Sequence, residues 1–180
     1  PYAPTGAQRR SAEEICHDLC GQTPMNRLLQ GDVGSGKTLV AAAAIWFAAQ
    51  NGWQSAMLAP TEILARQHAA NLADRLEPFG VNVTLLADGR AGLVVGTHAV
   101  LTDSVVFKNL GLAIVDEQHR FGVRQRGILA GKANNPHLLV MSATPIPRTL
   151  GLLMYGDLDI SILDELPPGR KPIKTWFITG

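Results

Sequence analysis

The 180-residue sequence predicts an α/β domain, built on a mainly parallel β-sheet with helices on both faces. Three observations predict this fold. Short segments that are apolar throughout alternate with longer segments of helical periodicity, which is typical of a parallel sheet covered on both sides. A glycine-rich motif joins one expected strand to one expected helix. Polar residues follow five of the expected strands, and ligands bind beyond the carboxyl ends of strands in such sheets.

The order of elements follows from apolar periodicity and from turn residues. The first expected helix spans 5–20, because Thr5 and Gln8 form a capping-box pattern before apolar residues at helical spacing. Three more helices are expected at 37–50, 61–77 and 147–155. Strands are expected at 25–30, 55–59, 83–86, 93–95, 112–115, 138–141 and 159–163.

One connection does not fit this scheme. The expected strands 83–86 and 93–95 are separated by only "ADGRAG", whereas a parallel crossover takes about a dozen residues or more. Either the two strands form an antiparallel hairpin that turns at Asp88-Gly89, or the chain lacks residues between them. We expect the second arrangement, with residues absent between Leu86 and Gly89, most simply at Leu86–Ala87.

Composition limits the classes of function. Apolar residues make up 46% of the chain and the net charge is +1, so a nucleic-acid site has to be local rather than a global basic field. The longest apolar run, 39–49, is shorter than the roughly 20 residues of a membrane span, so no membrane contact is expected. Cys16 and Cys20 are spaced along one helix face, which disfavours a disulfide and indicates a reducing, cytoplasmic compartment.

The glycine-rich motif predicts a nucleotide site. Its pattern G-x-x-x-x-G-K-[ST] is that of a P-loop, and a simple turn would not need three glycines, each costing about 0.5–1 kcal/mol. At the start of a helix, free backbone N–H groups and the helix dipole favour phosphate. We expect Lys37 to bind the β- and γ-phosphates of ATP and Thr38 to ligate Mg²⁺. The expected nucleotide-binding residues of the loop are Gly31, Asp32, Val33, Gly34, Ser35, Gly36, Lys37 and Thr38.

Two adjacent carboxylates close the expected strand that ends in "LAIVDEQH". We expect Asp116 to hold Mg²⁺ through its water shell, and Glu117 to act as the general base that orients the attacking water. The alternative is a solvated turn acid followed by a helix cap. Gln118 and His119 are candidates for sensing the γ-phosphate, although a hydrogen-bonded structural role for His119 stays open.

These motifs together resemble those of superfamily-2 helicases: the P-loop, the Asp-Glu-Gln-His box at 116–119 and Ser-Ala-Thr-Pro at 142–145. The longer strings are similar to the RecG family of bacterial branched-DNA helicases. They are "MNRLLQGDVGSGKT", "DEQHRFGVRQR", "MSATPIPRTL" and "FKNLGL". In the transcription-repair coupling translocases, the nearest relatives, Glu usually stands in place of Gln118.

The resemblance implies a RecA-like P-loop NTPase domain, the first of two motor domains. This domain is expected over 1–165, with 166–180 as the linker to a second motor domain that is missing here. An N-terminal wedge domain is also expected to be missing. Because the second motor domain supplies arginines to the γ-phosphate, the isolated chain is expected to be inactive.

The resemblance also implies roles for single residues. Gln8 is expected to contact adenine, and Ser142 and Thr144 to couple the nucleotide state to domain movement. DNA contacts are expected at Pro60, Thr61, Thr97 and His98. Arg66 and Lys108 are further candidates on the DNA face, with solvated surface charge as the alternative. Phe121 is expected to be a core anchor rather than a residue that stacks on bases.

The expected function is that of an ATP-dependent DNA helicase. ATP hydrolysis would be coupled to remodelling of branched DNA, such as stalled forks and Holliday junctions, in recombination and repair. One alternative is the motor of the transcription-repair coupling translocase. Another is a nucleotide-switched binding module without productive turnover, which the presence of Glu117 disfavours.

Overall fold

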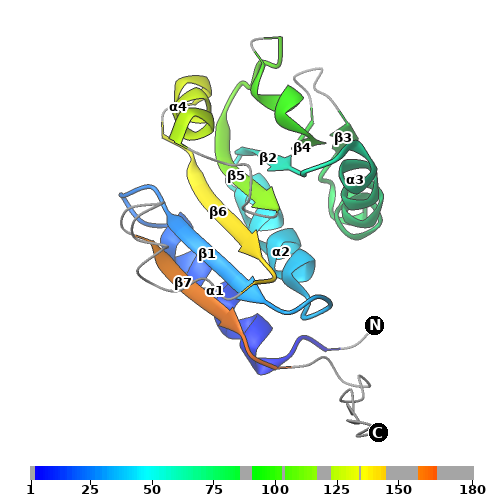
Figure 1. Ribbon diagram of the computed structural model, residues 1–180, viewed down its shortest axis with the longest axis vertical. Coiled ribbons are helices and arrows are strands. Elements are labelled where there is room, and N and C mark those ends of the chain that lie inside the picture. The colour runs from blue at the N-terminus through cyan, green and yellow to red at the C-terminus, as the bar shows by residue number, and fades with distance from the viewer. Residues whose placement is uncertain are drawn as a thin grey trace, which may run out of the picture.

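The computed structural model describes residues 3–85, 91–102, 104–116, 123–133, 135–144 and 158–165. Within these residues, seven strands and four α-helices form one layered α/β unit (Figure 1). The helices are α1 Gly6–Leu19, α2 Lys37–Gln50, α3 Glu62–Leu76 and α4 Val123–Lys132, with short 3₁₀ helices η1 Glu77–Phe79 and η2 His98–Leu101. The strands are β1 Asn26–Gly31, β2 Gln54–Leu58, β3 Val83–Leu85, β4 Leu93–Gly96, β5 Leu110–Asp116, β6 His137–Ser142 and β7 Asp159–Leu163.

The strands form a single sheet in the order β3-β4-β2-β5-β6-β1-β7. Every neighbouring pair in it is parallel, which confirms the predicted fold class. The carboxyl ends of all seven strands therefore lie at one edge of the sheet. In Figure 1, β6 and β1 run side by side through the centre, with β7 beyond β1.

Two apolar cores cover the two faces of the sheet. Along β5, Leu112 and Ile114 pack into the core under α1, α2 and α3, whereas Ala113 and Val115 pack into the core under η2 and α4. This alternation follows from the period of two in a strand. Helices on both faces were predicted, and the division of buried residues between two cores confirms this.

The structure tests the predicted helices and the local sequence signals on which they rest. At α1, the Thr5 hydroxyl accepts from the Gln8 backbone N–H at 3.2 Å, and the side-chain Oε1 of Gln8 accepts from the Thr5 backbone N–H at 3.0 Å, so the capping box is confirmed. The span of α2 is as predicted. The sequence did not predict α4, because Gly127 and Gly131 weaken its helical signal. The expected helix at 147–155 and the expected linker at 166–180 lie outside the described residues.

The pairing of β3 with β4 decides between a hairpin and a parallel arrangement of these two strands. The strands are parallel, in a register from Val83 opposite Leu93 to Leu85 opposite Val95, so the hairpin interpretation is wrong. Only residues 86–92 connect them, although a parallel crossover takes about a dozen residues or more. The expected interruption between Leu86 and Gly89 lies outside the described residues and stays a prediction.

Two further predictions concern compartment and membrane. Cys16 and Cys20 are both free thiols, as expected from their spacing on α1. Burial, followed by the neighbouring Cys20, raises the pKa of Cys16 and keeps this thiol protonated. In the part of the chain that the structure describes, no helix combines the length and the apolar character needed to cross a membrane.

Candidate nucleotide-binding site

The P-loop lies between β1 and α2 and depends on its glycines. Gly34 and Gly36 have φ angles of 81° and 91°, a left-handed conformation that favours glycine. A Cβ atom at Gly36 would collide with the side-chain nitrogen of Gln8. A Cβ atom at Gly31 would lie 2.6 Å from Ser35 Oγ. The loop therefore keeps its tight curve only with glycine at these positions.

The side chain of Lys37 folds back over this loop. Its Nζ donates to the carbonyl oxygens of Gly31 at 2.5 Å and Asp32 at 2.9 Å. Gly36 caps α2 and has no side chain to bond the first N–H groups of the helix. A positive charge and a helix N-terminus thus lie at one place, which suits a phosphate group.

Two other groups of polar residues that follow strands, at Asp116 and at Ser142, lie beside the P-loop, because β6 runs between β1 and β5. Ser142 is opposite Gln30 of β1, and Asp116 is opposite Met141 of β6. The Thr144 N–H donates to Ser142 Oγ at 3.2 Å, and the two hydroxyl oxygens are 3.2 Å apart. The structure thus brings the P-loop, Asp116 and the Ser142–Thr144 turn to one edge of the sheet.

The residues at this edge fit ATP with Mg²⁺. Side chains at Gly31 and Gly36 would collide with Ser35 and Gln8, so the loop keeps its tight curve at the start of α2, and Lys37 supplies positive charge. The Thr38 hydroxyl and the Asp116 carboxylate are both partly exposed, and oxygen ligands of this kind suit Mg²⁺. Ser35 Oγ is buried in the loop and has no hydrogen-bond partner within the described residues.

The side chain of Gln8 forms a hydrogen bond with the P-loop and helps to hold it in place, a role that the sequence did not reveal. Its side chain is almost completely buried, and its Nε2 donates to the carbonyl of Ser35 at 2.7 Å. The same amide completes the capping box of α1, so Gln8 ties the start of α1 to the loop. The contact with adenine that was expected for Gln8 stays a prediction.

His68 of α3 is a second residue that the sequence did not single out. Its Nε2 lies 2.5 Å from Asp116 Oδ2, and both side chains are only 15% exposed. The available signal was weak: His68 is a polar residue on a helix stripe whose other members, Ala65, Ala69 and Leu72, are buried. Sequence spacing alone does not show which strand this stripe covers.

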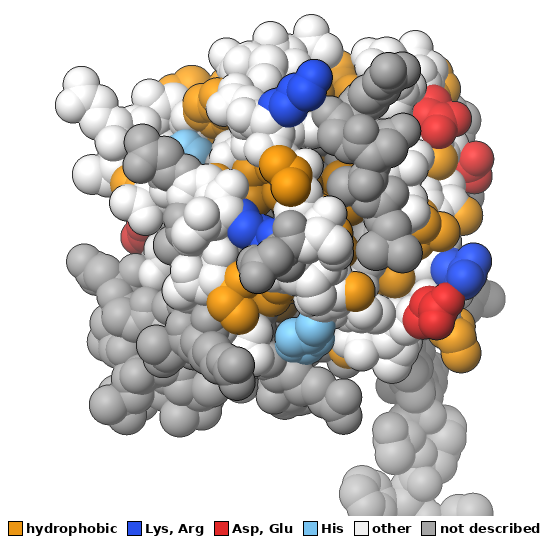
Figure 2. Space-filling model, turned by 90° about the horizontal axis from the view of Figure 1, so that it is seen from above, with side chains coloured by type: hydrophobic (Ala, Val, Ile, Leu, Met, Phe, Trp, Pro, Cys, Tyr) orange, Lys and Arg blue, Asp and Glu red, His pale blue; other side chains and the backbone are white. Residues whose placement is uncertain are grey.

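The predicted DNA-contacting residues lie at the same edge, on neighbouring strands. The Ala59 N–H donates to the Gly96 carbonyl at 2.8 Å, which places Pro60 and Thr61 next to the turn of Thr97 and His98. Thr61 also caps α3, because its Oγ1 accepts from the Leu64 N–H. Arg66 is exposed and pairs with Glu62 at 2.7 Å. On the face that Figure 2 shows, the described lysine, arginine, aspartate and glutamate side chains are scattered rather than gathered into one patch.

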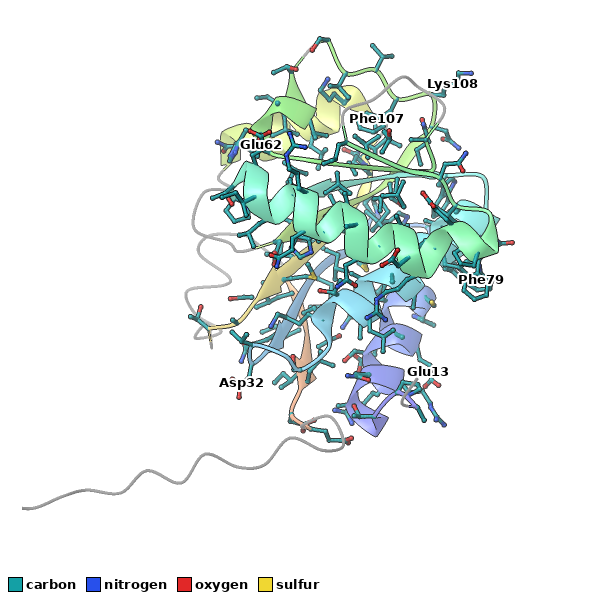
Figure 3. All side chains as sticks on the ribbon, turned by 90° about the vertical axis from the view of Figure 1, so that its right-hand side faces the viewer. Glu13, Asp32, Glu62, Phe79, Phe107 and Lys108 are labelled. Atoms are coloured by element: carbon teal, nitrogen blue, oxygen red, sulfur yellow. The ribbon has the colours of Figure 1, made fainter. Side chains whose placement is uncertain are left out.

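The prediction that Lys108 lies on the DNA face is wrong. Its backbone N–H donates to Gln54 Oε1 at 2.6 Å, next to the amino ends of β2 and β5. Figure 3 shows Lys108 and Glu62 toward opposite sides of the molecule. The physical reason is that Lys108 precedes its strand, whereas Thr61 follows one, and parallel strands separate these two ends.

Four residues with predicted roles lie outside the described residues. They are Glu117, Gln118, His119 and Phe121. Their predicted roles, as general base, as nucleotide sensors and as core anchor, stay predictions.

Comparison with known proteins identifies the family. The sequence profile of the DEAD/DEAH box helicases matches residues 5–153. The chain is 53% identical to the ATP-dependent DNA helicase RecG of Aquifex aeolicus, over 97% of this chain and 24% of that protein. It is 50% identical to RecG of Synechocystis, over 100% of this chain and 24% of that protein. The chain thus spans about a quarter of the length of the curated relatives it matches.

The alignment with the Synechocystis protein extends over 196 residues, more than the 180 of this chain. That relative therefore carries internal residues that this chain lacks. This supports the expectation of absent residues, and the short parallel connection from β3 to β4 is one place that could have held them.

A solved structure agrees with the sequence relatives. The structure of RecG bound to a three-way DNA junction superimposes with a TM-score of 0.78 at 43% identity, over 96% of this chain and 25% of that one. The fold is thus the RecA-like helicase fold that the motifs implied. The chain belongs to the DEAD/DEAH box helicase family.

Proposed function

We propose that this chain is the first of two motor domains of a RecG-type, ATP-dependent DNA helicase. Its ATP hydrolysis would drive remodelling of branched DNA, such as stalled forks and Holliday junctions, in recombination and repair. The observation that carries the proposal is the meeting of the P-loop, Asp116 and Ser142 at one sheet edge, in a chain about half identical to RecG along its whole length.

Each residue has a chemical role in this proposal. The P-loop N–H groups and Lys37 bind the β- and γ-phosphates, while Thr38 and Asp116 hold a Mg²⁺ ion that neutralises phosphate charge. Glu117 takes a proton from the attacking water. Ser142 ends β6, which lies between β1, the strand before the P-loop, and β5, the strand of Asp116. From this position, Ser142 and Thr144 would pass a change at the γ-phosphate to the DNA-facing loops.

In this proposal, the remaining parts of the helicase belong to other domains of the full-length protein. A second motor domain would supply arginines to the γ-phosphate, and an N-terminal wedge domain would contact the DNA junction. Pro60, Thr61, Thr97 and His98 would track DNA, with Arg66 beside them. A cytoplasmic location is supported by the two free cysteines.

The test is the ATPase rate of the full-length protein without DNA, with linear duplex and with forked DNA. Stimulation mainly by forks is expected. Stimulation mainly by linear duplex would instead indicate a duplex translocase of the transcription-repair type. Turnover that no DNA stimulates would indicate a nucleotide-switched binding module.

A second test separates binding from hydrolysis at the predicted base. Glu117→Gln in the full-length protein should keep Mg·ATP binding and lower turnover by roughly 10²–10⁴-fold, the usual contribution of a general base. If nucleotide affinity fell as far as turnover, Glu117 would be a metal ligand rather than the base.

A further inference from the structure

The contact between His68 and Asp116 joins α3 to the candidate nucleotide site. His68 Nε2 and Asp116 Oδ2 are 2.5 Å apart, a distance at which the ring N–H donates to the carboxylate. Each side chain is 15% exposed, so solvent and salt weaken this contact less than they weaken a surface pair.

The fold explains why these two residues meet. Asp116 follows Leu112 and Ile114 at intervals of two, so it points to the face of the sheet that α1, α2 and α3 cover. His68 lies on the buried stripe of α3, which faces the same core. The helix α3 packs mainly over β3 and β4, and from there His68 reaches Asp116 at the carboxyl end of β5, the strand beyond β2.

A carboxylate that assists a metal needs a fixed orientation. Asp116 has two oxygens, and a hydrogen bond from His68 to Oδ2 restricts rotation of the group, so that Oδ1 can hold the water shell of Mg²⁺. Partners of metal ligands commonly act in this way, and their loss typically costs about 10–100-fold in metal affinity or activity. Within the described residues, His68 is the side chain that the structure shows bonded to the Asp116 carboxylate.

We propose that His68 is a positioning residue that orients the Asp116 carboxylate for nucleotide-bound Mg²⁺. This inference rests on the proposed function, because it presumes that Asp116 assists the metal. It adds a component from α3, the helix whose N-cap is Thr61 on the predicted DNA face. One helix therefore carries both a predicted DNA contact and the residue that holds Asp116.

The experiment measures Mg²⁺-dependent binding of a fluorescent, non-hydrolysable ATP analogue by the full-length protein. His68→Ala should raise the half-saturating Mg²⁺ concentration about 10-fold or more, with binding in EDTA and the nucleotide-free melting temperature close to wild type. His68→Gln should recover part of this loss, because its amide N–H can donate over a similar reach. His17→Gln is the matched control, since the His17 side chain is 91% exposed, and it should change nothing.

A double variant tests whether His68 acts through Asp116. In an Asp116→Asn background, His68→Ala should cause no further rise in the half-saturating Mg²⁺ concentration, because His68 acts through Asp116. An equal further rise would overturn the proposal. So would an unchanged Mg²⁺ requirement in His68→Ala, including the case in which only the melting temperature falls. A wild-type protein without Mg²⁺-dependent nucleotide binding would instead refute the proposed function, and this is visible before any variant is compared.

Discussion

Two buried or half-buried histidines lie at opposite ends of the sheet, and their partners differ. At the carboxyl end, His68 meets the carboxylate of Asp116. At the amino end, His137 Nδ1 accepts from the Met25 N–H at 2.9 Å, and its ring stacks on Trp53 with centroids 5.4 Å apart. The first histidine faces a charged group at the candidate site, and the second completes a backbone hydrogen bond in the core.

The difference indicates that the residues of the candidate site and those that stabilise the fold lie at opposite ends of the sheet. Burial lowers the pKa of His137, and Asp18 opposes this only in part, so the ring stays neutral. A neutral ring also suits its hydrogen bond, because Nδ1 must keep its lone pair to accept from Met25. Polar groups at the carboxyl end are therefore expected to change activity, and those at the amino end to change stability.

The largest expected effect tests whether the carboxyl end is a complete site. The isolated 180-residue chain should hydrolyse ATP roughly 10³–10⁵-fold more slowly than the full-length protein, the range in which arginine fingers contribute. The measurement is steady-state ATPase with forked DNA. Equal rates would show that the site needs no residue from another domain.

Lys37 and Lys108 compare the two ends directly. Lys37→Ala should lower ATPase by roughly 10²–10³-fold, as loss of one transition-state donor does, with the melting temperature little changed. Lys108→Ala, at the amino end, should leave the rate near wild type. Both are measured in the full-length protein. An unchanged rate in Lys37→Ala would remove the nucleotide interpretation of the loop.

His137 should report on stability alone. His137→Ala leaves the buried Met25 N–H without its acceptor and should lower the free energy of unfolding by about 1–3 kcal/mol. Urea unfolding followed by tryptophan fluorescence measures this loss. An equally large loss of ATP affinity would contradict the proposed division between the two ends.

The pH dependence of the same residue has a defined sign. The pKa of His137 is lower in the folded chain than its ordinary value of about 6.5, so protons bind preferentially to the unfolded chain. Stability should be complete above about pH 6.5 and fall as the pH drops through the lowered folded pKa, with a slope of at most about 1.4 kcal/mol per pH unit. His137→Asn, which can still accept from Met25, should flatten this part of the curve. A curve identical to wild type would assign the slope to other groups.

The smallest effect on stability is expected at Arg66. Its exposed pair with Glu62 resembles surface ion pairs worth about 0.3–0.5 kcal/mol, so Arg66→Ala should change the free energy of unfolding by no more than that. If Arg66 contacts a phosphate, the variant should weaken DNA binding and reduce the salt slope by about one. Binding that is unchanged at all salt concentrations would leave Arg66 as a solvated charge.

The sequence by itself determined the parallel sheet, the P-loop and the edge at which Asp116 and Ser142 would meet Lys37. These predictions needed only local periodicity, a glycine pattern and the rule that parallel strands end at one edge. The same reasoning failed for Lys108, which precedes a strand rather than following one, and for α4, whose glycines weaken its signal.

Only the tertiary structure decided which helix covers which strand. His68 and Asp116 are 48 positions apart, and Gln8 and Ser35 are 27 apart, so no local period relates either pair. Each contact exists because a helix packs over the sheet at one register, set by apolar burial along its whole length. Local spacing gives the face on which a side chain lies, but packing alone selects the partner that it meets there.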